Sequence, residues 1–227
     1  MEGDPNKRTQ IINTLNTKSV TKQEVYNNTF EVFNMLKDIL HEMSGEINET
    51  IANARLVKVE YRDRGKFEAQ IQIAGDMLIF SMHTNIFEFN REHSIWQNPY
   101  TKQDVKNSYC GIINIYDFLA DSFKYNRSSD EGYLIGRIFI NRERQFFVEG
   151  KRQETYSHET FGTRTINKEH LTNIIETAIL YAIDFDLLVP PYDTLKIVAV
   201  EQMNTKIENS KIQTGKRLGY KFNSDDV

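Results

Sequence analysis

The sequence predicts an α+β domain in which helices flank an antiparallel β-sheet, in the order α-βββ-α-ββ-α. Glycine-containing turns at residues 62–65 and 74–77 separate three runs in which apolar and polar residues alternate, as they do in half-buried strands. A second pair of strand-like runs follows at residues 133–149. Apolar residues at helical spacing lie before, between and after these strands, which accounts for the three helices.

A long first helix is predicted to begin at Thr21, which forms a capping box with Glu24. We expect the helix to bend near Ser44 and Gly45. Residues 1–20 are polar and charged, and we expect them to form a flexible N-terminus. The apolar stripe of the helix consists of Val25, Phe33, Leu36, Leu40, Met43 and Ile47.

The turns fix a register for the three strands that follow. A three-residue loop at 63–65 ends in a glycine that suits a left-handed backbone, and it pairs Val59 with Ala69. A two-residue turn at 75–76 then pairs Ala69 with Met82. Both pairings place the apolar side chains of the three strands on one face, and a slip of one residue would mix the faces.

The opposite face of these strands is polar and carries a candidate metal site. The same register places Glu60 opposite Glu68, and Glu68 opposite His83. Directly opposed side chains lie roughly 4.5 to 5.5 Å apart at Cβ. Two carboxylates and an imidazole in such a row could hold a divalent metal or share a proton. The alternative is a solvated row in which neighbouring lysine and arginine side chains relieve the repulsion between the carboxylates.

Residues 104–123 are predicted to form the second helix, although residues 110–118 also fit a strand. The helical stripe consists of Val105, Tyr109, Ile112, Tyr116, Leu119 and Phe123.

The second hairpin joins residues 133–140 to residues 145–149 through a loop at 141–144, and it pairs Ile138 with Phe147. Both of its faces are apolar, so helices must cover one face and a loop, the C-terminal arm or another subunit must cover the other. We therefore predict that this hairpin and the aromatic C-terminal tail bind a protein partner or form a homodimer. The predicted partner-binding residues are Ile135, Phe139, Phe146, Val148, Tyr220 and Phe222.

The last helix begins after Asn167, which can cap it, and ends before the prolines at 190–191. The predicted organisation is a flexible segment at 1–20, a single domain at 21–190, and a C-terminal arm and tail at 191–227. The stripe of this helix consists of Leu171, Ile174, Ile175, Ala178, Ile179 and Ile183.

Glu149 and Lys151 close an apolar strand in a way that resembles the Glu-x-Lys of a restriction-type nuclease core. The resemblance implies that the glutamate binds a metal and the lysine positions the attacking water. Asp130 and Glu131, which could supply the second carboxylate, fall about five residue pairs away, roughly 17 Å along the strands. A bend after Lys151 would be needed to complete the site, so a charged strand end is the competing interpretation.

Composition excludes several classes of protein. A net charge of −4 over 227 residues gives no basic footprint for nucleic acid. The single cysteine, Cys110, excludes an internal disulfide framework and fits a reducing compartment. Neither a signal peptide nor an apolar run long enough to span a bilayer is found, so we expect a cytoplasmic protein without a cofactor.

The predicted order of elements resembles the layout of type III secretion chaperones and related small chaperone-like bacterial proteins. The strings MHTNIFEF, NIYDFLADSFKYNR, GYLIGRIFIN and FFVEGKRQ are similar to segments of uncharacterised bacterial proteins of about this length. The resemblance implies a fold but no activity, cofactor or catalytic residue. The expected function is therefore a non-enzymatic protein-interaction or chaperone-like module. A metal-dependent hydrolase or nuclease, built on either acidic cluster above, is the alternative.

Overall fold

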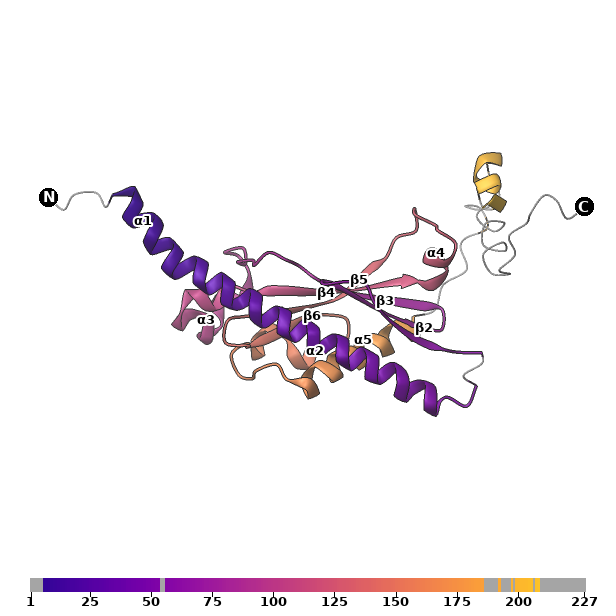
Figure 1. Cartoon of the computed structure of the whole chain (residues 1–227), viewed down its shortest axis with the longest axis horizontal. Coiled ribbons are helices and arrows are strands. Elements are labelled where there is room, and N and C mark those ends of the chain that lie inside the picture. The colour runs from indigo at the N-terminus through magenta and orange to yellow at the C-terminus, as the bar shows by residue number, and fades with distance from the viewer. Residues whose placement is uncertain are drawn as a thin grey trace, which may run out of the picture.

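A computed structural model of the chain describes residues 6–53 and 56–185 and, towards the C-terminus, residues 192, 197, 199–205, 207 and 208. It contains a six-stranded antiparallel sheet in which the strands pair in sequence order. Two long helices pack on one face of the sheet (Figure 1), which confirms the predicted α+β class. The strands are β1 (Val59–Asp63), β2 (Glu68–Ile73), β3 (Asp76–Met82), β4 (Gly111–Leu119), β5 (Tyr133–Ile140) and β6 (Phe146–Gly150).

The first long helix begins earlier than predicted. The helix α1 (Lys7–Thr14), a π-helical turn η1 (Leu15–Ser19) and the helix α2 (Val20–Thr50) follow one another without interruption. Asn6, not Thr21, caps the start, and its side chain accepts a hydrogen bond from the backbone of Arg8 at 3.2 Å. The predicted start at Thr21 is wrong because no glycine or proline interrupts residues 7–20, so the helix continues through them.

The main core lies between the sheet and the helices α2 and α5 (Lys168–Ile183). Phe33 and Leu36 of α2 are fully buried in this core, as are Ile71 and Phe80 of the sheet. The predicted cap of α5 is confirmed, because the side chain of Asn167 accepts a hydrogen bond from the backbone of His170 at 2.8 Å. The predicted stripes of both helices therefore face the core, except that Ile183 at the end of α5 is 44% exposed.

The predicted second helix at 104–123 is wrong: its centre is the strand β4, which pairs with both β3 and β5. Ile113 and Ile115 point into the main core, while the intervening side chains lie on the other face. β-branched residues fit such a central strand well, and strand pairing on both sides outweighs the helical spacing of the apolar residues. Short helices flank the strand, namely η3 (Val105–Ser108) and α4 (Ala120–Lys124).

The buried face of β1 to β3 is as predicted, but the register differs. Val59 lies opposite Ile73, and Ala69 lies opposite Phe80. The first loop is longer than predicted, although Gly65 has the expected positive φ of 117°. The second turn begins at Ala74, whose φ is 52°. Both shifts involve an even number of residues, so the same side chains remain inside.

In the second hairpin the shift is odd and the faces change. Ile138 lies opposite Val148 instead of Phe147, because the loop includes residue 145 and Arg144 adopts a positive φ of 59°. The register between β4 and β5 also shifts at Ile115.

A smaller core covers the second face of this hairpin. The connection between β3 and β4 crosses that face and contributes the short helices η2 (Ser94–Gln97) and α3 (Pro99–Gln103). The loop after β6, with η4 (Glu154–Tyr156) and η5 (His158–Thr160), contributes Phe161. The buried members of this second core are Ile95, Cys110, Phe139, Phe147 and Phe161. In the part of the chain that the structure describes, no helix has both the length and the apolar character needed to cross a membrane.

Candidate interaction site

The second hairpin, which was expected to bind a partner, is buried within the chain. Ile135, Phe146 and Val148 belong to the main core, and Phe139 belongs to the second core. None of these four side chains is more than 4% exposed. The prediction that they form an open binding face is therefore wrong, since the connection between β3 and β4 covers the side that the helices leave free. The remaining candidates, Tyr220 and Phe222, lie outside the described residues.

The predicted row of Glu60, Glu68 and His83 is not formed. Glu60 lies opposite Gln72, Glu68 lies opposite Ser81, and β3 ends before His83. Lys58 and Arg62 hold the Glu60 carboxylate at 2.9 and 3.2 Å, and hydrogen bonds from both lower the pKa of Glu60. Among the described residues, no three acidic, histidine or cysteine side chains are grouped so that they could hold a metal ion.

Glu149 is engaged by two basic partners. It lies opposite Arg137 on β5 and forms an ion pair with it, and its Oε1 lies 3.1 Å from Nε2 of His93. The Nδ1 atom of His93 accepts a hydrogen bond from the backbone of Ile95, so Nε2 carries the proton that His93 donates to Glu149. Lys151 is exposed at the strand end. The group next to Glu149 is therefore an arginine, not the second carboxylate that a nuclease site needs.

Sequence reasoning missed His93 because it lies in the irregular connection between β3 and β4, where no periodicity predicts which strand it reaches. His93 accepts a hydrogen bond from the backbone N–H two residues later, as asparagine and aspartate side chains often do in turns. Histidine at such a position gives little indication of this role in the sequence.

The N-terminal helix extends beyond the body of the molecule (Figure 1). Residues 7–20, which we call the helical arm, include no buried residue. Ile11, Ile12, Leu15 and Val20 are nevertheless apolar, with exposed fractions of 59%, 49%, 54% and 48%. A helix that is held away from the core normally carries polar side chains on all sides, so these four are the unusual feature of the arm.

The π-helical turn aligns three of these apolar side chains, namely Ile11, Leu15 and Val20. Ile11 and Leu15 are four residues apart and so lie on one side of an α-helix. Val20 follows five residues later, and its backbone N–H bonds to the carbonyl of Leu15. That bond places Val20 one turn above Leu15, whereas an ordinary α-helix would rotate it well away. The three side chains thus form a continuous apolar row.

The arm is also basic. Between residues 7 and 20 the chain has Lys7, Arg8 and Lys18 and no acidic residue, a local charge of +3 in a protein whose total is −4. The rest of the chain therefore carries −7. An apolar row among basic side chains suits an acidic partner surface.

The root of the arm is fixed to the body. The ammonium groups of Lys18 and Lys22 lie 5.7 and 5.6 Å from the centre of the Tyr109 ring. Six residues further on, Asn28 donates hydrogen bonds to the carbonyl groups of Asn141 and Arg142. These contacts fix the direction in which the arm leaves the body.

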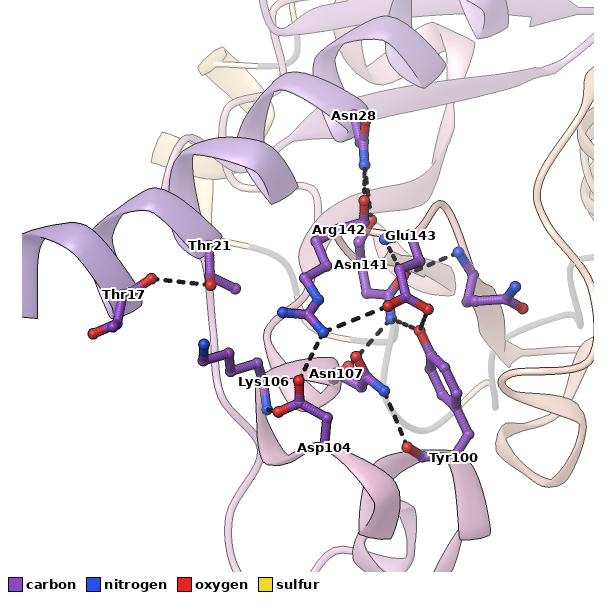
Figure 2. A network of polar contacts seen from close by, with 11 residues as sticks. Thr17, Thr21, Asn28, Tyr100, Asp104, Lys106, Asn107, Asn141, Arg142 and Glu143 are labelled. Carbon is purple, nitrogen blue, oxygen red and sulfur yellow. Dashed lines mark hydrogen bonds and ion pairs between the residues drawn. The ribbon is translucent and has the colours of Figure 1, made fainter.

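Figure 2 shows the polar network beside this root. Asn141 is fully buried, and its amide donates to the hydroxyl of Tyr100 at 2.8 Å, while that hydroxyl donates to Glu143 at 2.7 Å. Arg142 pairs with Asp104 at 2.7 Å. Burial is the main cause that raises the pKa of Tyr100, so the phenol stays protonated as a donor. This network joins the β5–β6 loop to α3 and η3, and it supports a structural role.

We compared the chain with protein-family models, with curated proteins and with solved structures, and none of the three comparisons gave a match.

Proposed function

We propose that the protein is a non-enzymatic, chaperone-like interaction module of the cytoplasm that binds an acidic partner protein on its helical arm. The observation that carries the proposal is the row of Ile11, Leu15 and Val20, which no part of the described chain covers. Burying three such side chains against a partner contributes several kcal/mol, at about 25 cal/mol for each Å² of apolar surface. The alternative function as a metal-dependent hydrolase or nuclease has no support from Glu60, Glu68 and His83, which are separated, or from Glu149, which is paired.

The charge of the arm selects among the binding partners. Two arms of +3 repel each other when they lie side by side, which disfavours a dimer formed through the arms. The charge of −7 on the rest of the chain disfavours the phosphate backbone of a nucleic acid. A helix-binding groove with acidic edges on another protein satisfies both the apolar row and the basic flanks.

The test uses the full chain and three charge variants. Leu15→Glu disrupts the apolar row, and Arg8→Glu reverses one of the flanking charges. Leu180→Glu is the matched control, because Leu180 is also 54% exposed but lies on α5, in the body. Partners captured from cell extract are purified and their affinity for each variant is measured by calorimetry.

The proposal expects an acidic protein whose affinity falls at least about tenfold with Leu15→Glu and with Arg8→Glu but is unchanged with Leu180→Glu. Added salt should weaken binding to the wild-type chain. A partner that binds all variants equally would overturn the proposal, as would capture of nucleic acid instead of a protein. Concentration-dependent dimers that Leu15→Glu disperses would show that the arm binds a second copy.

A further inference from the structure

A second feature, independent of the arm, is an acidic pocket of about 560 Å³ at the end of the sheet where the β2–β3 turn and β4 meet the start of β5. Its volume suits a small organic molecule. The residues that give the pocket its charge and its aromatic wall are Asp76, Asp117, Asp130, Glu131, Tyr133 and Phe185.

Asp117 is the unusual residue of this pocket. It lies on β4 between Leu78 of β3 and Tyr133 of β5, and it is only 8% exposed. Its Oδ1 atom is buried and has no hydrogen-bond partner among the described residues. Burial, and then the charge of Asp76, raise the pKa of Asp117 to about 6.

The neighbouring groups do not neutralise this carboxylate. Burial also raises the pKa of Asp76, and no ion pair of Asp76, Asp117 or Glu131 is found in the described part of the chain. Asp130 has partners of its own, Ser122 at 2.7 Å and Arg127 at 3.9 Å. A buried carboxylate without a partner costs free energy unless it is protonated or meets a cation. The composition of the pocket therefore favours a positively charged ligand.

The walls distinguish an organic cation from a metal ion. No three of the described acidic side chains are grouped closely enough to ligate a metal. The ring centres of Tyr133 and Phe185 lie 6.4 Å apart beside the carboxylates, and Phe118 and Leu119 extend the apolar wall. Aromatic faces attract organic cations and pack against alkyl chains, whereas they offer a divalent ion no ligand.

We propose that this pocket binds an alkylguanidinium or alkylammonium compound, with the cationic head at Asp117 and Asp76 and the alkyl chain against Tyr133 and Phe185.

The test is calorimetric titration of the full chain at pH 8 with butylguanidinium, and with its neutral isostere butylurea. We expect saturable binding of one butylguanidinium with a Kd of about 1 mM or lower, and at least about tenfold weaker binding of butylurea. Asp117→Asn should weaken butylguanidinium at least about tenfold, and Tyr133→Ala should weaken it several-fold. Glu154→Gln, which removes an equal charge from an exposed site, is the matched control and should leave the affinity unchanged.

Circular dichroism shows whether each variant is folded, and Tyr133→Ala provides a second measurement if Asp117→Asn does not fold. Equal binding of butylurea, or no saturable binding of butylguanidinium up to about ten times the expected Kd, would overturn the proposal. Displacement of butylguanidinium by Mg²⁺ or Ca²⁺ would identify a metal site instead. Leu15→Glu should bind butylguanidinium normally, so failure of the arm proposal does not affect this one.

Discussion

The side-chain amide of Asn28 on α2 lies 2.6 Å from the carbonyl oxygen of Arg142, 114 residues later in the chain, and 3.2 Å from that of Asn141. One side chain thus satisfies two carbonyl groups of the β5–β6 loop. The long helix, which carries the arm, is thereby joined to the head of the hairpin that carries the polar network (Figure 2). The direction of the arm consequently depends on a bond between two distant parts of the sequence.

Asn28→Ala should lower the free energy of unfolding by about 1–3 kcal/mol, because two partly buried carbonyl groups lose their donor. Urea denaturation measures this change. Asn27→Ala is the matched control: Asn27 is exposed on the same helix and its side chain bonds only to that of Gln23 in the hydrogen bonds we find, so its effect should stay below about 0.5 kcal/mol. Equal effects of the two variants would show that the hydrogen bonds from Asn28 to the β5–β6 loop do not stabilise the chain.

The close approach of α2 to β4 leads to a second prediction. A Cβ atom added at Gly111 would lie 2.1 Å from Oγ1 of Thr29, a fully buried side chain. Gly111→Ala should therefore force the helix away from the sheet and lower stability by about 1–3 kcal/mol, which thermal denaturation detects.

A double-mutant cycle tests this contact. Thr29→Gly also lowers stability, because it places a glycine inside the helix and leaves a small cavity, but it removes the atoms that Gly111→Ala would meet. The double variant should be more stable than the sum of the two single changes predicts. Strict additivity would mean that the two residues do not limit the approach of α2 to β4.

The burial of the first three strands and of α5 could be predicted from the sequence, because each depends on a short-range pattern. Residues that alternate along a strand keep their faces after an even shift of register, so Val59 and Ala69 were placed correctly although their partners were not. In the second hairpin, one additional residue in the loop changed the pairing of every residue. The residue types in this loop do not reveal its length, because Arg144 adopts a positive φ that arginine rarely has.

The strand β4 and the candidate sites depend on contacts that no local pattern records. The spacing of Tyr109, Ile112 and Tyr116 fits a helix, whereas residues 110–118 also fit a strand, and only pairing with β3 and β5 decides between them. The second core was missed because residues of the irregular β3–β4 connection fold back over the sheet. The pocket at Asp117 likewise combines residues from separate strands, and a single aspartate in an apolar strand was its only sequence signal.

The buried carboxyl group of Asp117 leads to a prediction about how the stability of the chain depends on pH. Its pKa in the folded chain is about 6, above the ordinary value of 3.8, so the folded state holds more protons than the unfolded state between those values. The stability contributed by this group is therefore highest below about pH 4, falls as the pH rises to about 6, and is constant above. The other acidic groups that line the pocket are Asp76, Asp130 and Glu131.

Asp117→Asn removes this charge and should stabilise the chain at pH 8. The difference between the pKa of about 6 in the folded chain and the ordinary value of 3.8 sets an upper limit of about 3 kcal/mol. The asparagine amide is itself buried, which reduces the gain. Denaturation midpoints at pH 8, 6 and 4.5 should show the advantage of the variant shrinking as the pH falls, whereas Glu154→Gln should show no such trend. If the variant were less stable than the wild type at pH 8, and by the same amount at pH 4.5, the carboxylate of Asp117 would not be destabilising the folded chain.

The last prediction concerns His93, which performs two roles with its two nitrogen atoms. Nδ1 accepts a hydrogen bond from the backbone N–H of Ile95 at 3.1 Å, and Nε2 donates one to Glu149 on β6. His93→Ala removes both bonds and should cost about 1–3 kcal/mol. His93→Asn should recover the first bond, because Asn98 caps Tyr100 through the same two-residue spacing, but asparagine is too short to reach Glu149.

The difference in the free energy of unfolding between His93→Ala and His93→Asn therefore measures the bond within the turn. The difference between His93→Asn and the wild type measures the contact with Glu149. Chemical denaturation of both variants, with and without Glu149→Gln, separates the two contributions. If the contact matters, Glu149→Gln should change the stability of the wild-type chain more than that of His93→Asn. Equal changes would show that the ion pair with Arg137 alone holds Glu149, and that His93 stabilises only its own turn.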